Sequence, residues 1–220
     1  MIDNNDNYET RYDVFNSFLV SNATYYGIEE LPVVKSCNKI PNKIITFSEA
    51  MKTNDYNQWV CFYELDYLFM RVWKQPRRYI EKLKKFNGVI SPDFSLYVNM
   101  PLCMQKYHTY MGRALANWFI ENGIDVIPNV RVGDNRTYDF VFDGLNNGDI
   151  VAIGTIGTCR KNIERKILVE GIRETIRRLN PSNIIIYGSL PKEIEAEYPN
   201  LKFCVFESNN FKKLKVKKHG

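Results

Sequence analysis

Apolar runs of strand length recur along the chain from residue 43 onward. Most of them are continuous rather than alternating, as expected for strands that are covered on both faces. The seven runs are KIITF (43–47), WVCFY (59–63), GVIS (88–91), IDVIPNV (124–130), DIVAIG (149–154), NIIIYG (183–188) and KFCVF (202–206). The segment TYDFVFDG (137–144) alternates apolar and polar residues, which predicts either an eighth strand or part of a hairpin.

Helical periodicity separates several of these runs. The clearest helix extends from Leu102 to Asn122, with Pro101 at its start and Gly123 as its stop. A second helix is predicted over 162–179 and is followed by Pro181. Its apolar stripe consists of Ile163, Ile167, Gly171, Ile172, Thr175, Ile176 and Leu179. Shorter helices are predicted at 76–86 and 191–199.

Repeated strand–helix–strand units predict an α/β fold with a mainly parallel sheet and right-handed crossover helices. Eight units would permit an irregular TIM-barrel-like arrangement, and fewer would give an open doubly wound sheet. We favour the barrel-like interpretation. The α/β domain is expected at 41–208, after an N-terminal arm and irregular connection (1–40) and before a basic tail (209–220).

The net charge of +5 comes from the end of the chain. The last ten residues, FKKLKVKKHG, carry five lysines and no acid, so the remaining residues are formally neutral. Lys212 and Lys213 in this tail are candidates for contact with nucleic acid or another acidic surface; the alternative is a solvated end.

Cysteine and histidine usage excludes several kinds of site. The five cysteines are widely spaced and odd in number, which predicts neither a disulfide framework nor a zinc motif. Two histidines make a His-based metal site or a Ser–His–Asp triad a poor interpretation. No secretory signal opens the chain, and no apolar stretch approaches the ~20 residues of a membrane span. We expect a cytoplasmic protein without a membrane partner.

Polar side chains follow most of the predicted strands. Because the carboxyl ends of parallel strands meet at one edge of a sheet, these side chains are expected to lie close together where ligands bind. The main candidates are Glu64, Asp66, Asp93, Ser95, Tyr97, Asn129, Arg131, Thr155, Tyr187 and Ser189.

Three carboxylates at this edge are candidate catalytic groups. Asp93 with Glu64 or Asp66 could bind a divalent cation through oxygen ligands, or serve as acid and base. The alternatives are that Asp93 and Asp66 cap helices or turns. Tyr97 is interpreted either as a fourth catalytic group or as a packed aromatic residue.

The segment GTIGTCRKN (154–162) is a candidate anion site between a strand and a helix. Helix N-termini expose unpaired N–H groups that favour phosphate. The anion-binding candidates are Gly154, Thr155, Gly157, Thr158 and Arg160. The pattern matches neither GxGxxG nor GxxxxGK[ST], and a purely geometric role for the glycines is the alternative.

The segment RVWKQPRRY (71–79) interleaves basic and aromatic residues. Arg71, Trp73, Arg77 and Arg78 could stack on bases and contact phosphates. The alternative is an ordinary charged helix surface.

Several segments together resemble the family known as domain of unknown function 4417. The most specific of them is SPDFSLY, and the others include ENGIDVIPNVRVGD, YDFVFDGL, VAIGTIGT and IIIYGS, so that the resemblance covers roughly residues 40–190. The family occurs in bacteria, archaea, phages and mobile elements. The resemblance implies a phage or mobile-element setting and a site that includes Asp93 and Tyr97. Where this chain has Val132, family members have Trp, which implies a reduced aromatic wall here.

Two functions follow from these patterns. The first is an enzyme that acts on a phosphate-bearing substrate, a nucleotide or nucleic acid, at the carboxyl end of the parallel sheet. The second is a non-catalytic protein that binds nucleic acid or a host protein.

Overall fold

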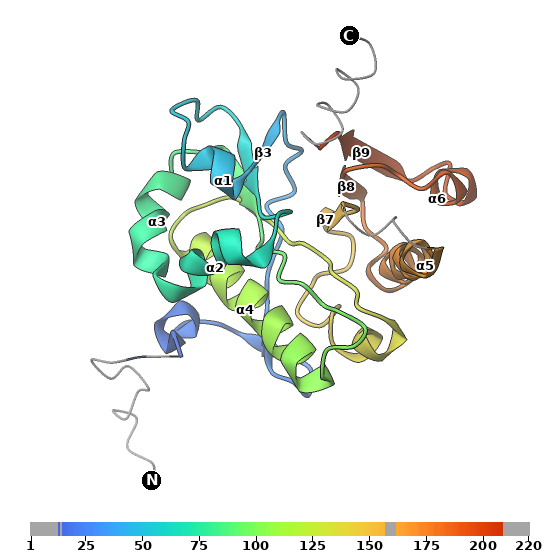
Figure 1. The fold of residues 1–220 in the computed structure, drawn as a ribbon, viewed down its shortest axis with the longest axis horizontal. Helices are drawn as coiled ribbons and strands as arrows, with labels where there is room; N and C mark the ends of the chain where they lie inside the picture. Colours follow the sequence, from blue (N-terminus) through green and yellow to red (C-terminus); the bar gives the residue numbers. More distant parts are fainter. Residues whose placement is uncertain (1–12, 14, 157–161, 209–220) are drawn as a thin grey trace.

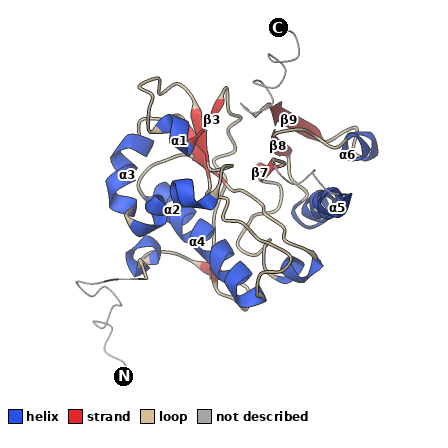
Figure 2. Cartoon of the chain, viewed as in Figure 1, coloured by secondary structure: helices blue, strands red, loops and turns tan. Residues whose placement is uncertain are grey.

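A computed structural model describes residue 13, residues 15–156 and residues 162–208. Helices and short strands alternate through most of this chain (Figures 1 and 2). The strands are β1 (Tyr25–Tyr26), β2 (Leu31–Pro32), β3 (Ile44–Thr46), β4 (Trp59–Cys61), β5 (Gly88–Ile90), β6 (Val126–Ile127), β7 (Val151–Gly154), β8 (Asn183–Tyr187) and β9 (Lys202–Phe206). The helices are η1 (Ser17–Val20), α1 (Phe47–Ala50), α2 (Asp66–Lys74), α3 (Pro76–Leu83), α4 (Leu102–Glu121), η2 (Asn135–Asp139), α5 (Asn162–Leu179) and α6 (Lys192–Glu197).

Two parallel sheets form the body, one of order β3-β4-β5-β6 and one of order β7-β8-β9. A parallel bridge between Asn129 and Ala152 connects them. Two backbone hydrogen bonds accompany this bridge, from Val130 N to Ala152 O (2.8 Å) and from Ala152 N to Pro128 O (2.9 Å). All seven strands therefore run in one direction and follow each other in chain order.

The α/β class and the parallel pairing are confirmed, as are the seven predicted strands. Within the described ranges no pairing joins β9 to β3, so these strands form no closed barrel, and the barrel-like arrangement stays a prediction. Their order also lacks the reversal that a doubly wound sheet has.

The prediction of an eighth strand at 137–144 is wrong. This stretch contains the end of η2, followed by turns. Phe140, Val141 and Phe142 are all buried in succession, so the apparent alternation does not separate two faces of a strand.

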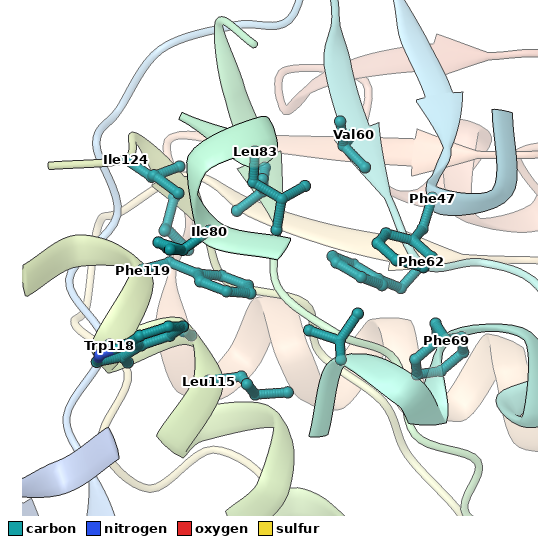
Figure 3. Close-up of a cluster of buried hydrophobic side chains, with 14 of the residues drawn as sticks. Phe47, Val60, Phe62, Phe69, Ile80, Leu83, Leu115, Trp118, Phe119 and Ile124 are labelled. Carbon is teal, nitrogen blue, oxygen red and sulfur yellow. The ribbon is translucent and has the colours of Figure 1, made fainter. Parts of the chain in front are cut away.

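Side chains of the strands alternate between one inner apolar cluster, which both sheets share, and an outer apolar cluster that is separate for each sheet. In the first sheet, Val60 and Phe62 point to the helical side, where Phe47, Phe69 and Phe119 pack around them (Figure 3). The opposite face gathers residues from both sheets into one inner cluster that includes Ile44, Cys61, Ile90, Ile127, Ala152 and Ile185. Because both faces are covered, the strands are apolar throughout.

Local sequence explains where helices begin and end. Thr46 and Glu49 form a capping box at the start of α1. Pro101 precedes α4, and Gly123, with φ of +78°, follows its end. Each helix in the described part of the chain is too short or too polar to cross a bilayer.

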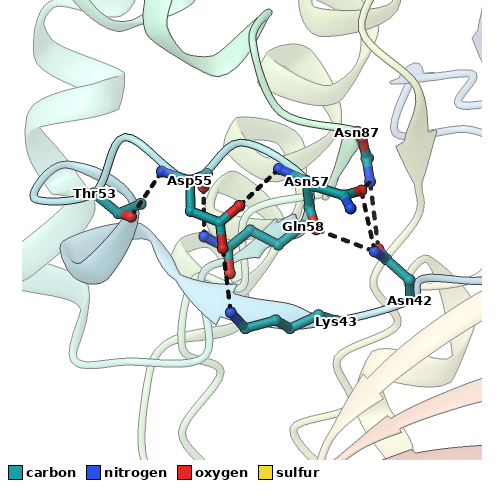
Figure 4. Close-up of polar contacts among 7 residues, drawn as sticks. All are labelled: Asn42, Lys43, Thr53, Asp55, Asn57, Gln58 and Asn87. Atoms are coloured by element: carbon teal, nitrogen blue, oxygen red, sulfur yellow. Dashed lines mark hydrogen bonds and ion pairs between the residues drawn. The ribbon is translucent and has the colours of Figure 1, made fainter.

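The amino ends of β3, β4 and β5 carry an exposed polar network (Figure 4). The Asn57 side-chain oxygen accepts hydrogen bonds from the amides of Asn42 (3.3 Å) and Asn87 (2.9 Å). Lys43 lies 3.5 Å from Asp55 in the same region. This network connects loops at the end of the sheet opposite to the candidate site.

Candidate functional site

A buried hydrogen-bond network joins the residues that follow β4, β5 and β6. Asp93, whose exposure is 3%, accepts from the Asn129 amide at 2.7 Å and from Arg131 Nε at 2.8 Å. Arg131 Nη2 donates to the second oxygen of the same carboxylate. The backbone N–H of Asn129 donates to the Ser91 hydroxyl at 2.8 Å. A two-point ion pair thereby ties the ends of β5 and β6 together.

The ion pair fixes the orientation and charge of Arg131. Burial disfavours the guanidinium charge, but the carboxylate of Asp93 outweighs this effect and raises the pKa of Arg131 above its ordinary value. Arg131 uses its Nε and Nη2 to pair with Asp93, so the edge of the guanidinium that carries Nη1 can donate to an acceptor on a ligand. About a quarter of the side chain is exposed (23%), so this arginine can meet a ligand.

Tyr63 extends the network into the inner cluster. Its hydroxyl donates to the Asn129 side-chain oxygen at 2.9 Å, and its ring stacks on Tyr187 at 5.4 Å. Burial, followed by the charge of Asp93, raises the pKa of Tyr63 well above its ordinary value, so the hydroxyl stays protonated as a donor. Gly154 lies under this ring: a Cβ there would come within 2.3 Å of it.

A cavity of about 710 Å³ lies beside Arg131. Its wall comes from the loop after β5, the loop after β6, the end of β7 and one face of α5. The lining residues are Ser95–Asn99, Val130–Gly133, Ile153, Gly154, Ile163, Glu164, Ile167, Leu168, Gly171, Ile172 and Thr175. The volume is in the range of small-molecule sites, about 300–1,000 Å³. Aliphatic side chains dominate the wall, and Arg131 is its basic side chain.

The structure brings Ser95, Tyr97, Arg131 and Gly154 together in the wall of this cavity. Asp93 does not line the cavity, but its carboxylate pairs with Arg131 and so orients the guanidinium. Asn129 does not line it either, and its side-chain amide donates a hydrogen bond to Asp93.

Other predicted residues at the carboxyl end of the sheet form hydrogen bonds that involve backbone groups. The Thr155 hydroxyl accepts from the N–H of Ser189 at 2.8 Å. The N–H of Thr155 donates to the carbonyl of Tyr187 at 3.0 Å. These contacts link the ends of β7 and β8.

Glu64 and Asp66 have partners of their own. Glu64 accepts from the N–H and hydroxyl of Ser48, both at 3.0 Å. Asp66 accepts from the N–H (3.2 Å) and hydroxyl (2.9 Å) of Ser95, and so anchors the loop at the cavity. Among the described residues, no three His, Cys, Asp or Glu side chains form a group suited to a metal.

The basic and aromatic segment at 71–79 lies across the end of α2 and the start of α3. Trp73 is buried (8% exposed), whereas the guanidinium of Arg77 lies 3.6 Å from the ring centre of Phe18. Arg71 lies over Phe47 at 5.0 Å, and Arg78 donates to the Gln75 side chain at 3.3 Å. The Trp73 ring is thus part of the core rather than a surface for stacking bases.

Five predicted binding residues lie outside the described residues. These are Gly157, Thr158, Arg160, Lys212 and Lys213.

The sequence analysis did not include Tyr63 or Ser91 among the candidate site residues, and it did not place the apolar stripe of α5 in the wall of a cavity. Tyr63 is the last residue of the apolar run WVCFY, and its position in this run indicates a strand residue. The signal for a role in the site is its hydroxyl, which needs a hydrogen-bond partner when a strand end is buried.

Comparison with known proteins identifies relatives of this chain. A family model described as Domain of unknown function (DUF4417) matches residues 23–206, which confirms the resemblance seen in the sequence. The Gene 1 protein of Mycobacterium phage L5 is 32% identical over 141 residues, covering 64% of this chain and 62% of that protein. For the Gene 1 protein of Mycobacterium phage D29 the identity is 29%, over 64% of this chain and 52% of that protein. The match thus spans less than two thirds of either relative. No solved structure matches the chain.

Proposed function

This chain belongs to the family Domain of unknown function (DUF4417), and for it we propose a function in binding and converting a phosphate-bearing ligand of nucleotide size. The observation that carries the proposal is the cavity of about 710 Å³ with Arg131 in its wall. A planar guanidinium that is held on one edge by Asp93 presents its other edge to a phosphate in a fixed direction.

The rest of the wall suits the body of a nucleotide. Aliphatic side chains such as Ile167 and Ile172 offer an apolar surface for a base. Tyr97, which is 56% exposed at the wall, offers an aromatic face for stacking. The apolar surface would hold the base while Arg131 holds the phosphate.

In an enzymatic reaction at this site, Arg131 would stabilise negative charge that develops on the phosphate. Tyr97 would be the group in contact with the ligand, and Asp93 would be a positioning residue that acts through Arg131. Glu64 and Asp66, expected from the sequence as catalytic, would support the loops around the cavity.

The test is binding to a panel of nucleoside monophosphates, the matching nucleosides and inorganic phosphate, measured by calorimetry. Monophosphates should bind at least about tenfold more tightly than nucleosides, since each tenfold step is about 1.4 kcal/mol and a charge-assisted hydrogen bond supplies more than that. Arg131→Lys keeps a charge beside Asp93 but removes the second edge of the fork, and should lose this preference.

Arg177→Lys is the matched control, because Arg177 pairs with Glu174 on the outside of α5 and does not line the cavity. A second variant, Ile167→Trp, fills the cavity and should abolish binding, whereas Lys166→Trp on the exposed side of the same helix should not. Equal binding of nucleotides and nucleosides, or binding unaffected by both cavity variants, would contradict the proposal.

Turnover is tested by chromatography of the bound nucleotides after incubation. New products that depend on Tyr97 and Arg131 would support an enzyme. Tight binding without products would leave the protein as a binding module. Salt-dependent binding of long nucleic acid, with no nucleotide in the cavity, would favour the non-catalytic alternative.

A further inference from the structure

Exposed apolar residues form part of the wall of the large cavity. Tyr97, Val98 and Ile163 line it, and each of these residues is more than half exposed. Leu96 and Ile172 line the same cavity but are buried. Single exposed apolar residues are normal on a protein surface, whereas several of them around one cavity indicate a ligand that covers them. The ligand of this cavity is therefore expected to extend past the buried part to the surface.

The loop that carries Tyr97 and Val98 is held by hydrogen bonds to its backbone carbonyls. The carbonyl of Tyr97 accepts from the N–H of Met100 at 2.9 Å, and that of Met100 accepts from the Gln105 side chain at 2.9 Å. The carbonyl of Val98 accepts from Arg136 Nη2 at 2.7 Å. A loop that is fixed in this way loses little conformational freedom when a ligand binds. The exposed side chains of Tyr97 and Val98 thus project from a preorganised backbone.

Arg136 repeats the arrangement of Arg131 on the surface beside this loop. Its Nε donates to both oxygens of Asp134 at 3.1 Å, and its Nη2 donates to the same carboxylate at 2.8 Å. Arg131 pairs with Asp93 through the same two nitrogens. In each pair, the edge of the guanidinium that carries Nη1 can donate to a phosphate. Arg131 lines the cavity, whereas the Arg136 side chain is 48% exposed and contacts Val98, so a second phosphate can be bound next to the cavity.

In an inference that rests on the nucleotide site proposed above, we infer that the ligand is the phosphorylated end of a single-stranded nucleic acid. The terminal phosphate binds Arg131, and the terminal base occupies the apolar cavity. The two faces of the Tyr97 ring can each take one base, so the second base stacks on the exposed face, beside Val98 and Ile163. Arg136 binds the phosphate of the second nucleotide. A free mononucleotide would leave the exposed apolar residues and Arg136 without contact.

The experiment measures by calorimetry the affinity of the full chain for deoxyadenosine monophosphate and for trideoxyadenylate with a 5′-phosphate, with a 3′-phosphate and with neither. A phosphorylated trinucleotide should bind about tenfold more tightly than the monophosphate, because stacking of one further base supplies about fivefold or more and a second phosphate contact adds to it. The trinucleotide without a terminal phosphate should lose most of this affinity. The same series of ribonucleotides distinguishes an RNA end from a DNA end.

Arg136→Met should lower the affinity for the phosphorylated trinucleotide about fivefold, the effect of one hydrogen bond, and more than it lowers that for the monophosphate. Arg177→Met is the matched control, because Arg177 is likewise exposed, pairs with Glu174 and does not line the cavity. Equal effects of the two variants would overturn the inference. Equal affinities for the monophosphate and every phosphorylated trinucleotide would also overturn it but leave the nucleotide proposal intact, whereas failure of both to bind would contradict that proposal as well.

Discussion

The two ends of the parallel sheet carry polar networks of opposite character. At the amino ends, Asn42, Asn57 and Asn87 exchange amide hydrogen bonds on an exposed surface (Figure 4). At the carboxyl ends, Asp93 and Arg131 form a buried ion pair beside a cavity. Both networks tie neighbouring strands together, but the first is exposed to water, whereas Asp93 at the centre of the second is buried.

This difference distinguishes polar residues that only connect loops from polar residues that can form a binding site. Exposed amides contribute little net stability, because water competes for the same hydrogen bonds. A buried charge pair is costly to assemble and specifies one geometry, which is what a binding site requires. Polar residues at strand ends therefore indicate a site only where burial and a cavity accompany them.

The largest expected effect comes from breaking the buried ion pair. Asp93→Asn should lower the free energy of unfolding by about 3–5 kcal/mol, because it leaves the Arg131 charge without its partner. The double variant Asp93→Asn/Arg131→Gln should recover a large part of this loss. Urea unfolding of the two variants and the wild type measures both values.

Asp125→Asn is the matched control at the amino end. Asp125 precedes β6 and pairs with the exposed Lys39, at 2.5 Å. Its removal should leave the unfolding free energy nearly unchanged, since exposed ion pairs contribute little. Equal losses at Asp93 and Asp125 would show that the two ends do not differ.

A second comparison uses tyrosine hydroxyls. Tyr63→Phe should cost about 1–3 kcal/mol, because the buried side-chain oxygen of Asn129 loses its donor. Tyr56→Phe, near the amino ends, removes an exposed bond to Asn54 of 3.3 Å and should cost much less. The difference is measured by chemical denaturation, and a difference near zero would contradict a buried network around Asn129.

The elements of the fold could be predicted because continuous apolar runs and helical stripes are local signals. The helix at 162–179 has the predicted bounds, and the long α4 ends one residue before the predicted Asn122. The failure at 137–144 has a physical reason: Phe140 and Phe142 are buried by tertiary packing around a 3-10 turn, and short alternation cannot distinguish this from a strand.

The site was predictable only in its location. Parallel strands bring Tyr97, Arg131 and Gly154 to one edge, as the strand pattern implied. The pairing of Asp93 with Arg131 depends on neighbouring strands β5 and β6, and single-sequence patterns do not specify side-chain partners. The burial of Arg113 in α4 could not be predicted either, because an arginine within a helical pattern ordinarily lies on the surface.

A smaller effect is expected within the exposed amide network. Asn57→Ala removes the acceptor that Asn42 and Asn87 share, yet both amides can turn to water. The expected loss is about 0.5 kcal/mol, at the lower limit for a hydrogen bond. A double-mutant cycle with Asn87→Ala gives the coupling, and a coupling above about 2 kcal/mol would place this network in the same class as the buried one.

The smallest effect concerns pH at the amino end. The hydrogen bond and charge of Asp125 raise the pKa of Lys39 above its ordinary value of 10.5. A raised pKa in the folded state means that the contribution of this pair is complete below 10.5 and is lost as the pH rises through the folded-state value. Lys39→Met should therefore show a slightly lower Tm than the wild type near neutral pH, and the two Tm curves should converge only above pH 10.5. Convergence near neutral pH instead would show that Lys39 and Asp125 do not interact at this end of the sheet.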